Sequence, residues 1–142
     1  MECILCAIVS GDPRVESMKL FETELSMVVM NLYPYNPGHI MIFPKRHVAE
    51  IGKMTLKEWD ETFLLVKKSL GIIKDLYKCG SFNIGWNIGK DSGASLKHVH
   101  LHIVPRYRNE IGFVDILSGT KIIIEDPGKS FKRLSAAFKE RR

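Results

Sequence analysis

The sequence lacks any apolar run approaching the roughly 20 residues that a membrane-spanning helix requires. Its first residues carry neither the basic start nor the long apolar stretch of a signal peptide, and no internal repeat or low-complexity tract follows. Cysteine is scarce as well, and three thiols without an export signal favour metal ligands or free thiols over a disulfide framework. We therefore expect a cytoplasmic protein with no membrane partner.

The residues that are present fit one globular domain. The chain has 142 residues, 45% hydrophobic and 26% charged, which is enough to bury a core, and we expect a single domain over residues 1–142. Its net charge of +5 favours an anionic partner, which can be nucleic acid, a membrane surface or a phosphorylated small molecule. Much of the excess lies in residues 129–142, which we interpret as a solvated basic tail. Only Phe131 and Phe138 interleave with these charges, so specific nucleic-acid binding is not expected.

The first half of the chain predicts a hairpin. Residues 19–31 are rich in apolar and β-branched side chains and predict an extended segment. Residues 31–38 are turn formers and predict a loop, and residues 39–43 predict a short strand that Pro44 ends. The two extended segments predict an antiparallel pair joined by a long turn.

The clearest helix begins at Thr55, because Thr55 and Glu58 form a capping-box pattern. Apolar residues then follow at alternating spacings of three and four and form one continuous stripe. We interpret the stripe as a face that packs onto a sheet, and a role in a dimer interface is compatible with that interpretation. Its members are Leu56, Trp59, Phe63, Val66, Leu70, Ile73 and Tyr77.

The second half predicts further strands and a terminal helix. The predicted segments are strands at 81–88 and 97–105 with a glycine-bearing loop at 89–94, a strand at 121–124, a turn at 126–128 and a helix at 129–140. Strands joined mostly by hairpins, with one long helix between them, predict an α+β fold built on an antiparallel sheet.

Residues 98–104 are the most informative segment, because three histidines alternate in them with apolar residues. Side chains alternate across a strand, so His98, His100 and His102 are expected on one face, about 6 to 7 Å apart. Such a row serves two chemistries: ligation of a metal, and attack on phosphorus by a neutral imidazole whose other nitrogen is hydrogen-bonded. The spacing alone leaves both open.

This segment resembles the signature of the histidine-triad family, in which three histidines alternate with hydrophobic residues. Residues 31–44, with an asparagine and a proline-glycine-histidine turn before a strand, resemble the other typical segment of the family. The resemblance extends from Cys3 to Arg106 and implies the fold of that family.

The resemblance also implies roles for individual residues. His100 is expected to be the nucleophile that becomes nucleotidylated, and His102 to lie close to the α-phosphate oxygens. Asn31 matches a residue that contacts the ribose. Asn87 stands where the fragile-histidine branch has a longer glutamine near the phosphates, and Ser95 where that branch has a hydroxyl residue near the bridging oxygen.

Two further residues complete the expected site. His39 resembles a supporting member of the histidine network. Gly93 belongs to the loop before Ser95, whose backbone N–H groups could bind phosphate oxygens, although a plain turn explains this glycine equally well.

A metal site is expected near the N-terminus. Cys3 and Cys6 have the spacing of half a tetrahedral zinc site, and no second cysteine pair exists, so histidines must supply the other ligands. His47 and His98 are the candidates, and a similar set of two cysteines and two histidines occurs in relatives of this family. Two reduced thiols without a metal are the alternative. Cys79 is outside any motif and is interpreted as a plain thiol.

The resemblance implies the reaction too. Residues 106–113, followed by residues 119–123, resemble the branch that contains diadenosine tetraphosphate phosphorylases and fragile-histidine hydrolases. We therefore expect cleavage of dinucleoside polyphosphates at the α-phosphate, with water or phosphate as acceptor, by a homodimer, with a divalent cation such as magnesium on the substrate. The alternatives are a nucleoside phosphoramidase, a nucleotide-binding regulatory protein with vestigial catalysis, and a metal-dependent hydrolase with all three histidines on the metal.

Overall fold

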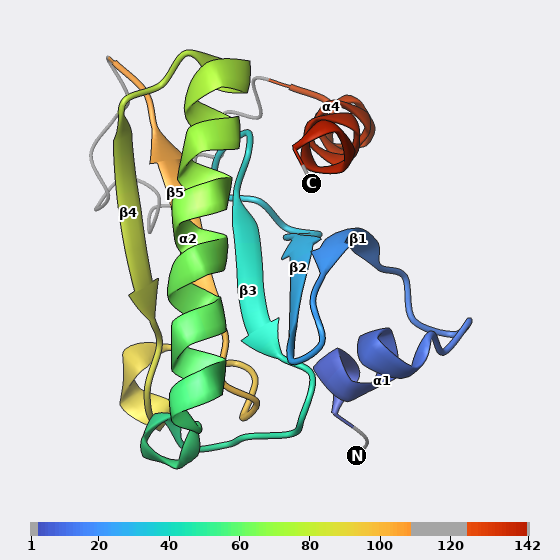
Figure 1. The fold of residues 1–142 in the computed structure, drawn as a ribbon, viewed down its shortest axis with the longest axis vertical. Helices are drawn as coiled ribbons and strands as arrows, with labels where there is room; N and C mark the ends of the chain where they lie inside the picture. The colour runs from blue at the N-terminus through green and yellow to red at the C-terminus, as the bar shows by residue number, and fades with distance from the viewer. Residues whose placement is uncertain (1–2, 109–124, 142) are drawn as a thin grey trace.

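A five-stranded antiparallel sheet forms the centre of the computed structural model, which describes residues 3–108 and 125–141. The strands follow the order β1-β2-β3-β5-β4 (Figure 1). Together with the helices on the sheet, this order confirms the predicted α+β fold with an antiparallel sheet. The strands are β1 (Met18–Glu22), β2 (Ser26–Met30), β3 (Ile40–Pro44), β4 (Ser81–Trp86) and β5 (Leu101–Arg106).

The first two strands correct the prediction of one extended segment over residues 19–31. The chain reverses between β1 and β2, where the Thr23 N–H donates to the carbonyl of Ser26. A polar Glu22-Thr23-Glu24 sequence in the middle of the apolar segment is the local cause of this turn. The predicted antiparallel pairing of residues 39–43 with the preceding segment is confirmed, because β2 and β3 pair from Ser26 opposite Pro44 to Met30 opposite Ile40.

The long helix α2 (Leu56–Tyr77) begins where the sequence predicts it. Thr55 accepts the Glu58 N–H, and the Glu58 carboxylate accepts the Thr55 N–H, so both halves of the capping box are present. The expected stripe is only partly correct, because Leu56 is 81% exposed and Phe63 is 59% exposed. The face buried against the sheet is made by Glu58, Thr62, Leu65, Ser69, Ile72 and Ile73.

The C-terminal helix α4 (Pro127–Glu140) corrects two predictions. Residues 126–128 are not a separate turn, since Asp126 caps the helix by accepting the Lys129 N–H and Pro127 is its first residue. Residues 129–142 are not a solvated tail either, because Leu134 and Phe138 are fully buried in the main core beside β1 and α2. The predicted strand at 121–124 lies outside the described residues.

The sheet has a helix on each face, and the two faces have different cores. Helix α2 packs on the face that carries Val28, Ile42 and Ile103, together with α4 (Figure 1). A smaller cluster on the opposite face joins Leu5 of α1 (Ile4–Ser10) to Met27 and Phe43. No helix of the described ranges is long and apolar enough to span a membrane. The face with the smaller cluster carries the candidate site.

Candidate functional site

A cavity of about 400 Å³ opens on the face of the sheet that carries α1. Six of the residues expected from the sequence line it: Asn31, Asn87, Gly93, Ser95, His100 and His102. His39 does not line the cavity but lies fully buried, within hydrogen-bonding distance of His102. The structure therefore brings the expected substrate residues together around one hollow.

The histidine segment is less regular than predicted. The strand β5 begins at Leu101, so His98 and His100 precede it, and the predicted strand over 97–105 is wrong at its start. At this point the backbone is hydrogen-bonded to the loop after β3 and not to a neighbouring strand, because the Val99 N–H donates to the carbonyl of Val48 at 2.7 Å. The rings of His100 and His102 are consequently 4.8 Å apart between centroids, closer than an extended row would place them.

His100 is held in one tautomer. Its Nδ1 lies 2.8 Å from the carbonyl oxygen of His98, and because a carbonyl can only accept, Nδ1 must carry the proton. In the neutral ring the Nε2 lone pair is then free, as a nucleophile requires. The side chain is 5% exposed and forms part of the cavity wall.

A second chain of hydrogen bonds fixes His102. The Tyr35 N–H donates to His39 Nδ1 at 3.1 Å, so the proton of His39 is on Nε2. That nitrogen lies 2.9 Å from His102 Nδ1, which must accept. His102 therefore carries its proton on Nε2 and can donate it to an anionic oxygen in the cavity. Asn31 adjoins this chain, with its Nδ2 at 3.4 Å from His39 Nε2.

Burial keeps this pair of histidines uncharged. The pKa of His39 is lowered to about 3, mainly by burial and to a smaller extent by the neighbouring His102 and His100. Burial is also the larger cause of the lowered pKa of His102, about 4, with His100 the smaller one. Both rings are neutral near pH 7, so His102 acts on an anion as a hydrogen-bond donor rather than as a cation.

The loop before His39 is pinned to β5. Asn36 donates its side-chain N–H to the Pro105 carbonyl at 2.8 Å, and the Tyr107 hydroxyl donates to the Pro37 carbonyl at 2.7 Å. Gly38 has a φ of +84°, and a Cβ there would lie 3.1 Å from the Pro105 ring. The proline-glycine-histidine turn thus needs glycine both for its backbone conformation and for its closeness to β5.

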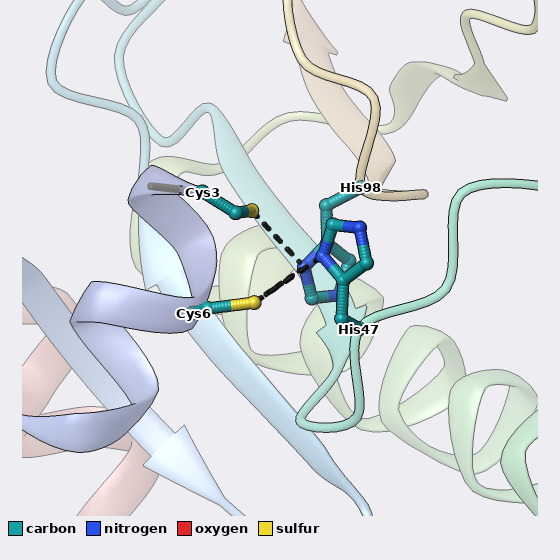
Figure 2. Close-up of side chains that lie close together, drawn as sticks. All are labelled: Cys3, Cys6, His47 and His98. Atoms are coloured by element: carbon teal, nitrogen blue, oxygen red, sulfur yellow. Dashed lines mark hydrogen bonds between the residues drawn. The ribbon is translucent and has the colours of Figure 1, made fainter. Parts of the chain in front are cut away.

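Four side chains expected to bind a metal also converge (Figure 2). The ligand atoms of Cys3, Cys6, His47 and His98 all lie within 4.8 Å of one another. Cys3 Sγ is 3.5 Å from His98 Nδ1, and Cys6 Sγ is 3.3 Å from His47 Nδ1 and 3.6 Å from His98 Nδ1. These residues come from α1, the loop after β3 and the segment before β5.

The donor set fits a tetrahedral ion. Bonds of about 2.3 Å to sulfur and 2.0 Å to nitrogen at tetrahedral angles place S and N roughly 3.5 Å apart. Three sulfur–nitrogen separations, 3.3, 3.5 and 3.6 Å, match this value, and all four ligand atoms lie within 4.8 Å of one another. His98 Nε2 lies 2.8 Å from the Pro44 carbonyl and therefore carries the proton, which leaves Nδ1 free to ligate. The four residues could hold a metal ion.

The loop after β4 gives a mixed result. Gly93 has a φ of +82° and ends the short 3₁₀ turn Lys90–Ser92, and its N–H donates to the Lys90 carbonyl. Because that N–H is used within the turn, the structure favours the plain-turn interpretation of Gly93. Asn87 and Ser95 are exposed and border the cavity.

Sequence reasoning missed α1. Ile4, Leu5 and Ile8 form an apolar wall of the cavity, and Cys3, the N-cap of the same helix, and Cys6 carry the two sulfurs of the cluster that could hold a metal. The apolar spacing of these residues, followed by glycine at position 11 in the left-handed conformation, is the signal that predicts a short helix here.

Comparison with known proteins gives three findings. The HIT domain family model matches residues 12–109. An AP-4-A phosphorylase of Mycobacterium tuberculosis is 38% identical over 76% of this chain, and an asymmetrical bis(5'-nucleosyl)-tetraphosphatase of Schizosaccharomyces pombe is 33% identical over 72%. The matched regions are 56% and 57% of those two proteins, so this chain matches little more than half the length of each.

The fold comparison agrees. A crystal structure of a Zn-bound histidine triad family protein from Mycobacterium smegmatis superposes with a TM-score of 0.82, covering 99% of this chain and 96% of that one. The sequence identity is 24%, so this likeness supports the fold.

Proposed function

This chain belongs to the HIT domain family, and from that membership we propose that it is an enzyme cleaving dinucleoside polyphosphates at the α-phosphate. The observation that carries the proposal is the fixed tautomer of His100, which leaves its Nε2 free in a ring that lines the cavity together with a hydrogen-bond donor, His102. The names of the two relatives support the substrate class.

In the first step, His100 Nε2 forms a bond to the α-phosphorus. The bond from that phosphorus to the bridging oxygen breaks, and its electron pair leaves with the nucleoside polyphosphate. The imidazole becomes cationic, and its Nδ1–H remains hydrogen-bonded to the His98 carbonyl, which stabilises the new charge. His102 Nε2–H donates to a non-bridging oxygen, whose negative charge grows in the transition state.

In the second step, an acceptor oxygen forms a bond to the phosphorus and the P–N bond breaks; where the acceptor is water, its proton is released to the solvent. The electron pair of the P–N bond returns to Nε2, which restores neutral His100. Water as acceptor gives a hydrolase and inorganic phosphate gives a phosphorylase. Ser95, at the cavity wall, is proposed to contact the bridging oxygen, and Asn31 and Asn87 the ribose and phosphates. Magnesium is proposed to arrive with the polyphosphate.

The test is a product analysis with diadenosine tetraphosphate, with and without phosphate. Expected results are ADP plus ATP if phosphate is the acceptor, or AMP plus ATP if water is, with an adenylyl adduct on His100 detected by mass. His100→Ala should abolish both the adduct and turnover. Absence of turnover and of the adduct in the parent protein would contradict the proposal, and turnover of adenosine phosphoramidate alone would assign the phosphoramidase activity instead.

We further propose that the ion held by Cys3, Cys6, His47 and His98 is zinc. Two thiolates and two imidazoles are a typical structural zinc set, and reduced thiols fit the cytoplasm. With four protein ligands the site is closed, so its contribution is to fix the backbone around His98. Elemental analysis of protein purified without added metal should find one zinc per chain, and Cys6→Ser should remove it.

A homodimer is the last part of the proposal, with the exposed edge of β4 as its interface. Ile84 on this edge strand is 44% exposed. On α2, Trp59 stacks with Phe63 at 6.0 Å and contacts Trp86 of β4 at 5.5 Å, so exposed apolar groups adjoin the edge. An unpaired apolar edge strand favours pairing with a second copy. Ile84→Lys should convert the dimer to a monomer in sedimentation analysis, while Lys74→Ala should not.

A further inference from the structure

A second cavity lies beside the first, and apart from the residues that the two cavities share its lining has no role in the steps above. Its volume is about 390 Å³, nearly that of the first cavity. Asn87, Ser95 and Leu96 line both hollows, so these residues form a shared wall. His100 and His102 line the first cavity but not the second.

The charge of the second cavity suits a polyphosphate. Lys90 and Lys97 are exposed and line it, and none of its lining residues within the described ranges carries a carboxylate. Two ammonium groups at the mouth of a hollow attract anions and form charge-assisted hydrogen bonds to phosphate oxygens.

The rest of the lining suits a nucleoside. Trp86, Ile88 and Val99 provide apolar and aromatic surface, and Ile88 is 57% exposed. Bases stack on such surfaces whatever their identity, because every base has a π face. The cavity thus offers cations next to the shared wall and an apolar surface, as a nucleotide with several phosphates requires.

We infer that the second cavity binds the leaving half of the substrate, a nucleoside 5'-polyphosphate, while the first binds the nucleotidyl half. This inference rests on the proposed function for the identity of the ligand. In-line displacement puts the leaving oxygen opposite the attacking nitrogen. His100 is in the first cavity and Ser95 borders both, so the phosphate chain passes from His100 over Ser95 into the second cavity.

A binding experiment tests the cavity without turnover. His100→Ala protein is saturated with labelled AMP and titrated with ATP, which is the leaving half of diadenosine tetraphosphate. ATP should bind without displacing the AMP. Adding Lys90→Gln and Lys97→Gln should weaken ATP binding by about tenfold or more for each lysine. Lys139→Gln, on α4, is the matched control and should leave it unchanged.

Ala49→Phe gives a second, uncharged test, because Ala49 is exposed and lines the second cavity but not the first. The phenyl ring should fill part of the second cavity and block the binding of ATP, while AMP should still bind in the first cavity. The inference would be overturned if ATP failed to bind the AMP-saturated protein. It would also be overturned if the lysine variants and the phenylalanine variant bound ATP as tightly as the His100→Ala protein without these changes.

Kinetics separate this inference from the proposed function. The lysine variants should raise the KM for diadenosine tetraphosphate and leave that for the p-nitrophenyl ester of AMP unchanged, because the small leaving group does not reach the second cavity. Equal effects on both substrates would contradict the inference. No turnover of either substrate by the parent protein would contradict the proposed function instead, and the ATP titration would still decide whether the second cavity binds a nucleotide.

Discussion

Replacing His39 by leucine should make the free energy of unfolding depend less on pH below pH 6.5. The pKa of this histidine is about 3 in the folded protein, against an ordinary value of 6.5, and burial is the main cause. Below pH 6.5 the unfolded chain therefore binds a proton at His39 that the folded protein does not. The contribution of His39 to the free energy of unfolding is therefore present above pH 6.5 and is lost as the pH falls toward 3. The loss approaches about 1.4 kcal/mol per pH unit for this one group.

The magnitude can be checked between pH 6.5 and 4.5, before the carboxylates of the folded protein begin to titrate strongly. Over these two units, His39 alone should cost roughly 2.3 kcal/mol, because at pH 6.5 it is already half protonated in the unfolded chain. His102, with a pKa of about 4, adds a similar slope, as does any release of metal, but both occur in the parent protein and in His39→Leu. The difference between the two curves therefore reports the burial of His39 together with its hydrogen bond to His102.

The assay is urea denaturation at several pH values, followed by fluorescence of Trp59 and Trp86. The free energy of unfolding of the parent protein should fall more steeply with decreasing pH than that of His39→Leu. The variant is expected to be less stable than the parent at pH 7, because it leaves His102 Nδ1 without its donor, and to lose part of this disadvantage by pH 4.5. Parallel curves would refute the reasoning that His39 is buried in its neutral form.

Three further predictions concern the turn, the donor and the metal. Gly38→Ala should lower the free energy of unfolding by about 2 kcal/mol, because an alanine is strained at a φ of +84° and its methyl group meets Pro105; an unchanged denaturation midpoint would contradict this. His102→Ala should lower kcat by about 10² to 10³-fold while adenylylated His100 still forms slowly, whereas unchanged kcat would exclude it as the donor. Cys6→Ser, or chelation of the parent protein, should release zinc, lower the melting temperature and raise the dissociation constant for AMP, because α1 forms a wall of the nucleotide cavity. Cys79→Ser is the control, since that thiol lies outside the metal cluster, and equal zinc loss in both variants would refute the assignment.

Features that depend on nearby residues could be predicted from the sequence. The capping box of α2 is an example, because Thr55 and Glu58 satisfy each other within one helical turn. The histidine alternation is another, since Leu101 and Ile103 enter the main core while His102 faces the cavity, as a strand requires. In both cases the determining contacts are local or follow from the twofold periodicity of a strand.

Features that depend on distant contacts could not be predicted in this way. The start of β5 is displaced because Val99 bonds to Val48, about 50 residues earlier, and no pattern in residues 97–105 indicates that. The burial of the basic C-terminal segment depends on Leu134 and Phe138 meeting β1 and α2. The exposed part of the α2 stripe is explained by the position of β4 at the sheet edge, where no further strand of the described chain covers it.

The position of His98, two residues before the proposed nucleophile His100, has a structural explanation. Its side chain contributes Nδ1 to the metal cluster and donates Nε2–H to Pro44, so the residue is fixed from two sides. Its carbonyl accepts the Nδ1–H of His100 and thereby selects the tautomer with a free Nε2. The same cluster includes Cys3 and Cys6 at the start of α1, whose apolar residues line the first cavity, the proposed nucleotide site. If the cluster holds the proposed zinc, removing the metal should therefore alter both the orientation of His100 and the proposed binding of the nucleoside, which a metal serving stability alone would not do.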